Sequence, residues 1–73
     1  MLQERTWYEY NRANVSMIPR GSCGAYLVAD ANKETLYIGS SESKNIGIRG
    51  RLISHIIKHR FRSAKYFKFA LGP

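Results

Sequence analysis

Cysteine and long apolar runs are both scarce in this sequence. Cys23 is the only cysteine among 73 residues, which excludes an internal disulfide framework and a Cys-rich zinc site. A single free thiol and the absence of an apolar leader at the N-terminus predict a reducing, cytoplasmic (intracellular) location. A phage or plasmid origin of the gene is compatible with this location. The apolar runs are no longer than five residues, whereas roughly 20 are needed to span a bilayer, so no membrane partner is expected.

The length allows one small domain. A chain of 73 residues buries only about 60% of the surface that its unfolded form exposes, so its core is expected to be weakly stable. A hydrophobic fraction of 44% with 12% aromatics is nevertheless too apolar for a disordered chain.

Acidic residues are confined to one part of the chain. Residues 1–43 carry four bases and all five acids, a net charge of −1, whereas residues 44–73 carry eight bases and no acid, a net charge of +8. Such segregation favours a polyanionic partner, and nucleic acid, DNA before RNA, is the obvious one. The alternative is a basic surface that only aids solubility. The candidate nucleic-acid-binding residues are Lys44, Arg49, Lys58, Arg60, Arg62, Lys65 and Lys68.

A β-hairpin is predicted in the middle of the chain. Residues 25–29 and 35–38 are rich in residues that suit strands, and the segment between them has turn chemistry, with Asn32 able to adopt a left-handed conformation. If the turn has two central residues, Tyr26 lies directly opposite Tyr37 and both rings share one face of the sheet. A slip of one residue would place the rings on opposite faces.

One main helix and a third strand complete the predicted fold. Apolar residues recur at helical spacing from Ile48, and the helix is expected to end near His59; residues 66–71 alternate weakly and predict a strand. The fold class is α+β (α/β in the broad sense), a three-stranded antiparallel sheet with one amphipathic helix. Residues 1–17 form an arm or short helix, and residues 18–73 form the core. An uncovered sheet face would call for a missing C-terminal part, a partner protein or self-association.

Four residues make the strongest chemical constellation: Tyr26 and Tyr37 on the sheet, with Arg51 and His55 on one helix face. A phenol whose pKa is lowered by a neighbouring cation can act on water, and a guanidinium matches the oxygens of a phosphoryl group. Simple sheet packing is the alternative for the two tyrosines. A reactive pair of Cys23 with His55 or His59, and a metal held by the two histidines, are weaker alternatives.

These residues resemble the GIY-YIG nuclease superfamily. Gly24-Ala25-Tyr26 stands where that family has its GIY triplet, Tyr37-Ile38-Gly39 reproduces YIG, and Arg51 with His55 resembles its helix signature. The resemblance covers about residues 18–71.

The resemblance implies an endonuclease that hydrolyses DNA phosphodiester bonds. In it, Tyr26 is the general base or water-positioning phenol and Tyr37 its partner. Arg51, or alternatively Arg49, stabilises the phosphate, and His55 assists. The family uses a divalent cation such as Mg²⁺, anchored by a glutamate after the third strand. No acid follows Glu42 here, so no metal ligand is identified. A degenerate DNA- or RNA-binding module is therefore the second hypothesis, and a basic component of an RNA–protein particle is the third.

Overall fold

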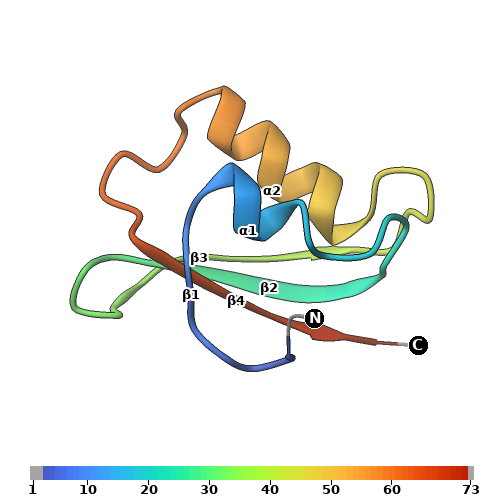
Figure 1. Ribbon diagram of the computed structural model, residues 1–73, viewed down its shortest axis with the longest axis horizontal. Helices are drawn as coiled ribbons and strands as arrows, with labels where there is room; N and C mark the ends of the chain where they lie inside the picture. The colour runs from blue at the N-terminus through green and yellow to red at the C-terminus, as the bar shows by residue number, and fades with distance from the viewer. Residues whose placement is uncertain (1–2, 73) are drawn as a thin grey trace.

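The computed structural model describes residues 3–72 and contains one antiparallel sheet with two helices on one of its faces (Figure 1). The sheet has four strands in the order β1-β4-β2-β3. The elements are β1 (Tyr8–Glu9), α1 (Arg12–Val15), β2 (Gly24–Ala29), β3 (Thr35–Ser41), α2 (Gly47–Ile57) and β4 (Tyr66–Leu71). The predicted α+β class, with an antiparallel sheet and one main helix, is confirmed. The additional strand, β1, is too short to give a periodic signal in the sequence.

The hairpin between β2 and β3 forms, but the predicted register is wrong by two residues. Tyr26 lies opposite Gly39, and Tyr37 lies opposite Val28. The loop has three central residues rather than two, since the amide of Lys33 donates to the carbonyl of Asp30 and the amide of Asp30 donates to the carbonyl of Glu34. Lys33, not Asn32, takes the left-handed conformation, with φ 63°.

A second irregularity in the strand pairing returns the side chains of Tyr26 and Tyr37 to the same face of the sheet. The register shifts again between Val28 and Ala29, at a β-bulge. Each of the two irregularities displaces the pairing by one residue, and side chains alternate with a period of two. The two displacements together therefore keep Tyr26 and Tyr37 on the same face, as predicted.

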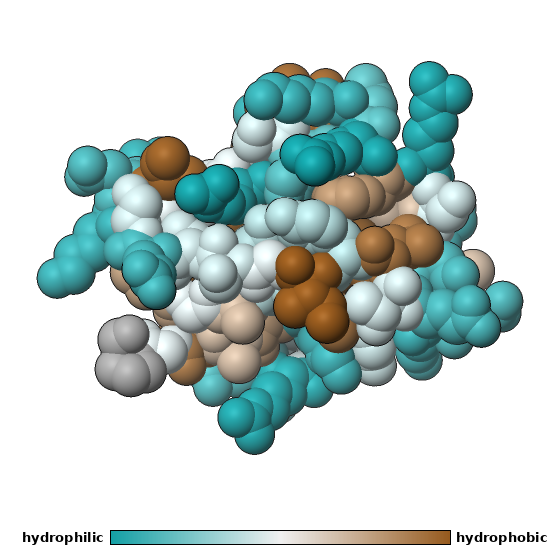
Figure 2. Space-filling model, turned by 180° about the vertical axis from the view of Figure 1, so that it is seen from behind, coloured by the Kyte–Doolittle hydropathy of each residue, from teal (hydrophilic) through white to brown (hydrophobic). Residues whose placement is uncertain are grey.

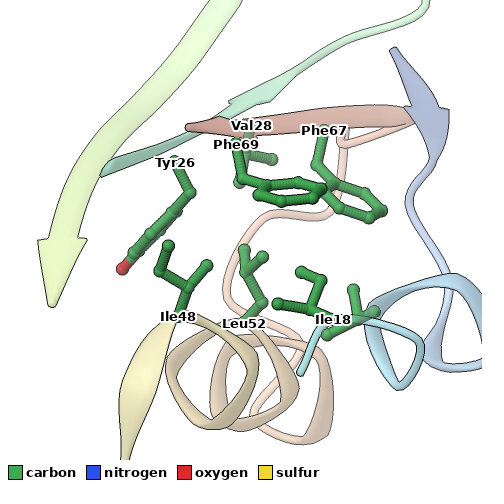
Figure 3. Close-up of a cluster of buried hydrophobic side chains, with 8 residues drawn as sticks. Ile18, Tyr26, Val28, Ile48, Leu52, Phe67 and Phe69 are labelled. Atoms are coloured by element: carbon green, nitrogen blue, oxygen red, sulfur yellow. The ribbon is translucent and has the colours of Figure 1, made fainter. Parts of the chain in front are cut away.

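The core lies between the sheet and the helices (Figure 3). Val28 and Phe67 from the sheet and Leu52 from α2 are completely buried there. Tyr8 and Tyr10 extend this core, because their rings lie 5.8 and 6.4 Å from the ring of Phe67. The N-terminal segment thus contributes to the helix-covered side of the sheet.

Among residues 3–72, no helix lies on the opposite face of the sheet (Figure 1). Trp7 reaches it and meets Tyr66 edge to face, with ring centroids 6.4 Å apart. Two large apolar side chains of β3, Leu36 and Ile38, are 40% and 67% exposed. Figure 2 views the molecule from behind, not directly onto this face, and shows apolar atoms interspersed with polar and charged side chains. Within residues 3–72, no helix has the length and apolar character needed to cross a membrane.

Helix α2 ends two residues earlier than predicted, at Ile57, in a Schellman motif. The amide of Arg60 donates to the carbonyl of His55 at 3.0 Å, and the amide of His59 donates to the carbonyl of Ile56 at 3.1 Å. His59 has φ 51°, at the position that glycine usually occupies. The chain therefore reverses direction at His59.

Replacing His59 by glycine is expected to stabilise the protein. Glycine removes the steric cost of the left-handed conformation, which is about 1 kcal/mol, and this outweighs its larger entropy loss on folding at such a site. The free energy of unfolding, measured by urea denaturation, should rise. The matched control is Lys58→Gly: Lys58 has φ −83°, so glycine should lower stability there. A lower stability for His59→Gly would contradict the assignment of the motif.

Candidate functional site

Glycines at two positions of the hairpin allow the close contacts on which the site depends. A Cβ on Gly39 would lie 2.5 Å from Cζ and Oη of Tyr26, so the ring of Tyr26 packs directly over this glycine. Gly24 has φ 145°, and a Cβ there would overlap the carbonyl oxygen of Ala70 on β4. Close packing therefore requires glycine both at Gly24, which begins Gly24-Ala25-Tyr26, and at Gly39, which ends Tyr37-Ile38-Gly39.

Tyr26 and Tyr37 lie together on the helix-covered face of the sheet. Their ring centroids are 6.1 Å apart, and the rings are tilted by 35°. Tyr26 is 2% exposed, whereas Tyr37 is half-buried. The ring of Tyr26 borders the apolar cluster, and its hydroxyl points away from that cluster (Figure 3). The buried phenol thus presents its polar end at the edge of the core.

Helix α2 brings His55 against both tyrosines. Its Nε2 lies 3.2 Å from Oη of Tyr26, and its ring centroid lies 5.6 Å from that of Tyr37. His55 is 9% exposed. Because the imidazole lies within hydrogen-bonding distance of a buried hydroxyl, it holds that hydroxyl in a fixed position. The sequence-based prediction that Tyr26, Tyr37 and His55 come together thus agrees with their placement.

The reversal after α2 adds two residues that the sequence analysis did not assign to this site. The ring of Phe61 lies 5.1 Å from those of both Tyr37 and His55. The guanidinium carbon of Arg60 lies 5.8 Å from the ring centroid of Tyr37. Arg60 was expected only as a nucleic-acid contact. His59 is the left-handed residue at which the chain turns back to the sheet. Because it is not a glycine, the sequence does not indicate this turn.

Arg51, rather than Arg49, acts electrostatically on the cluster. Arg51 is exposed on the same side of α2 as His55, and its charge lowers the pKa of both Tyr26 and His55. Arg49 instead lines a hollow with Arg12 and Arg20. The structure therefore does not bring the alternative arginine to the tyrosines.

The net shift in the pKa of Tyr26 is opposite to the one the sequence analysis expected. Burial, and then the neighbouring Tyr37, raise the pKa of Tyr26 more than the charges of Arg51 and Arg60 lower it. The phenol is therefore protonated at neutral pH and is a hydrogen-bond donor. Burial, followed by the charges of Arg60, Arg51 and Lys58, lowers the pKa of His55, so the imidazole is neutral and has one nitrogen free to accept.

Tyr10 is a third phenol near the cluster that the sequence analysis did not predict. Burial, and then the neighbouring Tyr26, raise the pKa of Tyr10 to about 12. Its hydroxyl is buried and has no hydrogen-bond partner among residues 3–72. Tyr10 lines a hollow of about 530 Å³ together with His55 and Arg62. No motif in the sequence indicates this position.

The other predicted nucleic-acid contacts fall on different surfaces. Lys58 and Arg62 are exposed beyond the cluster, at the end of α2 and after it, and Lys65 is exposed just before β4. Lys44 lies in the loop before α2. Lys68 points to the helix-free face, where its Nζ lies 4.4 Å from the ring centroid of Trp7. Lys68 is therefore separated from the tyrosines by the sheet.

The described residues do not form the Mg²⁺ site that the resemblance implies. Residues 3–72 contain no group of three or more His, Cys, Asp or Glu that could hold a metal ion. The Glu4 carboxylate accepts from the amide of Leu71, and that of Asp30 accepts from two amides of the hairpin loop. Glu42 borders a hollow with Cys23 and Lys44, and no histidine lines it. No carboxylate joins the tyrosine cluster, so we derive no step through a metal.

The weaker alternatives gain no support from the geometry. The thiol of Cys23 contacts the carbonyl of Gly21, with sulfur and oxygen 3.8 Å apart. His59 is exposed at the end of α2, while His55 is engaged with Tyr26. Comparison of the chain with protein-family models, with curated proteins and with solved structures gives no match.

Proposed function

We propose that this protein is an endonuclease domain of the GIY-YIG type, which hydrolyses DNA phosphodiester bonds. The observation that carries the proposal is the convergence of Tyr26, Tyr37 and His55 beside the guanidinium groups of Arg51 and Arg60. The net charge of +7 supports a polyanionic substrate.

In this proposal the exposed groups meet the phosphate first. Arg51 and Arg60 attract it and stabilise the negative charge that grows on its oxygens during attack. Tyr37, half-buried beside Arg60, donates a hydrogen bond that orients the phosphate or the attacking water. The side chains that bind substrate thus lie around the opening of the cluster, and Tyr26 and His55 lie inside it.

In this proposal Tyr26 and His55, the buried pair, transfer the proton of the attacking water. The water oxygen bonds to phosphorus, and the bond from phosphorus to the leaving oxygen breaks. The water gives its proton to the Tyr26 hydroxyl as that hydroxyl passes its own proton to the neutral His55. The leaving oxygen takes a proton from solvent, and His55 releases its extra proton into the hollow that it lines, which restores the starting state. The high pKa of Tyr26 suits this relay, because the phenol never needs to exist as a free phenolate.

The test is nicking of supercoiled plasmid over a range of Mg²⁺ concentrations. Tyr26→Phe removes the relaying hydroxyl and should reduce the nicking rate by about 10²–10⁴-fold. Arg51→Ala should reduce it by about 10²–10³-fold. The control is Tyr66→Phe, which removes a hydroxyl on the other face of the sheet and should leave nicking unchanged. Circular dichroism verifies that each variant is folded.

A second function, nucleic-acid binding without cleavage, is favoured by one observation. Residues 3–72 contain no group of His, Cys, Asp or Glu that could hold a metal ion, and proteins usually bind Mg²⁺ through one or two carboxylates. If the wild-type protein leaves plasmid intact at every Mg²⁺ concentration but binds DNA with an affinity that falls as salt rises, this function replaces the first. If its affinity for DNA does not depend on salt, both proposals are wrong.

A further inference from the structure

A second basic site lies on the other side of α2. A hollow of about 370 Å³ is lined by three arginines, Arg12, Arg20 and Arg49, together with small, polar and aliphatic residues. The arginines come from α1, from the loop after it and from α2. Among the residues that the structure describes, no acidic residue lines the hollow. We infer that this hollow binds a phosphate group, and that the phosphate belongs to the backbone of a nucleic acid.

The fold holds the three arginines together through specific contacts. The carbonyl of Ser22 accepts from the amide of Ile48 at 2.8 Å, which ties the loop after Arg20 to the first turn of α2, next to Arg49. Figure 1 shows this loop running beside the start of α2. Helix α1, which carries Arg12, is anchored by Val15, and Val15 is fully buried in the core. The positions of the arginine backbones are therefore set by structure that does not depend on a ligand.

The positive charge of the hollow favours the binding of an anion. Three guanidinium groups around a space of this size repel one another, and no carboxylate lines the hollow to neutralise them. Arg12 and Arg20 are exposed and Arg49 is half-buried, so their side chains can reach an incoming group. A guanidinium binds the oxygens of a phosphate through two parallel hydrogen bonds, and three of them can surround one phosphate or two neighbouring ones.

This site is separate from the tyrosine cluster. Arg49 and Ile53 of α2 line the hollow, whereas Arg51 and His55 act at the cluster. Successive residues of a helix are rotated by about 100°, which places these two pairs on different sides of α2. A nucleic acid backbone is long enough to contact both sides of one helix, whereas a single free phosphate is not. The inference concerns binding only and holds whether or not the chain cleaves DNA.

The experiment measures binding of a short DNA duplex by fluorescence anisotropy over a series of salt concentrations. Arg12→Gln, Arg20→Gln and Arg49→Gln should each weaken binding by about five- to tenfold and should lower the slope of log affinity against log salt by about 1. The control is Arg5→Gln, an equal change of charge at a residue that borders a hollow on the helix-free face. It should alter affinity and slope much less.

A second arm identifies the source of the phosphate. Inorganic phosphate is titrated into protein labelled with ¹⁵N, and the Nε–Hε signals of the three arginines are followed by NMR. Loss of duplex affinity in the three variants, with weak saturation by free phosphate, supports the inference. Tight saturation by free phosphate with unchanged duplex affinity would keep the anion site and refute nucleic acid as its source. If the variants behave like Arg5→Gln and the signals do not move, the site does not exist.

Discussion

Replacing Gly39 by alanine is expected to slow the proposed DNA cleavage by about 10²-fold or more while leaving the protein folded. The added Cβ would lie 2.5 Å from the Tyr26 hydroxyl and 2.7 Å from Cε2 of Tyr37, so both rings must move. Overpacking of this kind costs about 1–3 kcal/mol of stability. A displacement of about 1 Å in a catalytic group costs about 10²-fold in rate, so the nicking rate should fall by at least that factor. Plasmid nicking and urea denaturation measure the two effects.

Gly72→Ala provides the matched control. Gly72 is exposed just after β4, and its added Cβ would lie 3.6 Å from Cα of Gly24, which is an ordinary van der Waals contact. Alanine at this position should leave both stability and nicking essentially unchanged. A Gly39→Ala variant that cleaves DNA at the wild-type rate would show that the positions of the two phenols do not matter.

Phe67→Ala is expected to remove about half of the protein's stability or more. Phe67 is fully buried, and it packs against Tyr8 and Tyr10 as well as the central cluster. Truncating a buried phenylalanine costs about 3–5 kcal/mol, and a domain of this length has a total stability of about 4–11 kcal/mol. The midpoint of thermal unfolding, followed by circular dichroism, should fall sharply or the transition should disappear.

Phe61→Ala is the control for Phe67→Ala, because it also removes an aromatic ring but from a half-buried position. Phe61 is half-buried at the edge of the central cluster, where its ring contacts Tyr37 and His55. Because much of its ring already meets water, its removal should cost only about 1 kcal/mol. Equal destabilisation by the two substitutions would mean that β1 and β4 do not form the closely packed layer described above.

The elements of this fold are largely readable from the sequence because each has a local signal. The spacing of apolar residues from Ile48 predicts α2, and the third predicted strand coincides with β4. β3 extends three residues further than predicted, through Gly39, because pairing with β2 continues to Ser41. β1 exists only because the backbone of Tyr8 and Glu9 pairs with β4, a partner more than fifty residues away. Such pairing leaves no local pattern.

The candidate site was predictable where one element supplies the spacing. Arg51 and His55 lie four residues apart on α2, and their common side follows from helical geometry. Arg60 joins the cluster only because His59 reverses the chain, and the sequence has no glycine at this position to mark the reversal. Likewise, Arg12 and Arg20 come from a segment of almost zero net charge, so a count of charges along the chain could not assign them to a basic surface.

The paired irregularities of the hairpin restrict how its length can change. The three-residue loop and the bulge opposite Val28 and Ala29 each insert a single residue, and either insertion alone would have placed the two tyrosines on opposite faces. An insertion or deletion of one residue between positions 26 and 37 would direct one phenol away from α2, whereas a change of two would preserve the arrangement. To keep both phenols toward α2, the length of the connecting turn can therefore change only in even steps, and its composition is restricted at Asp30, whose carboxylate accepts from two amides of the loop.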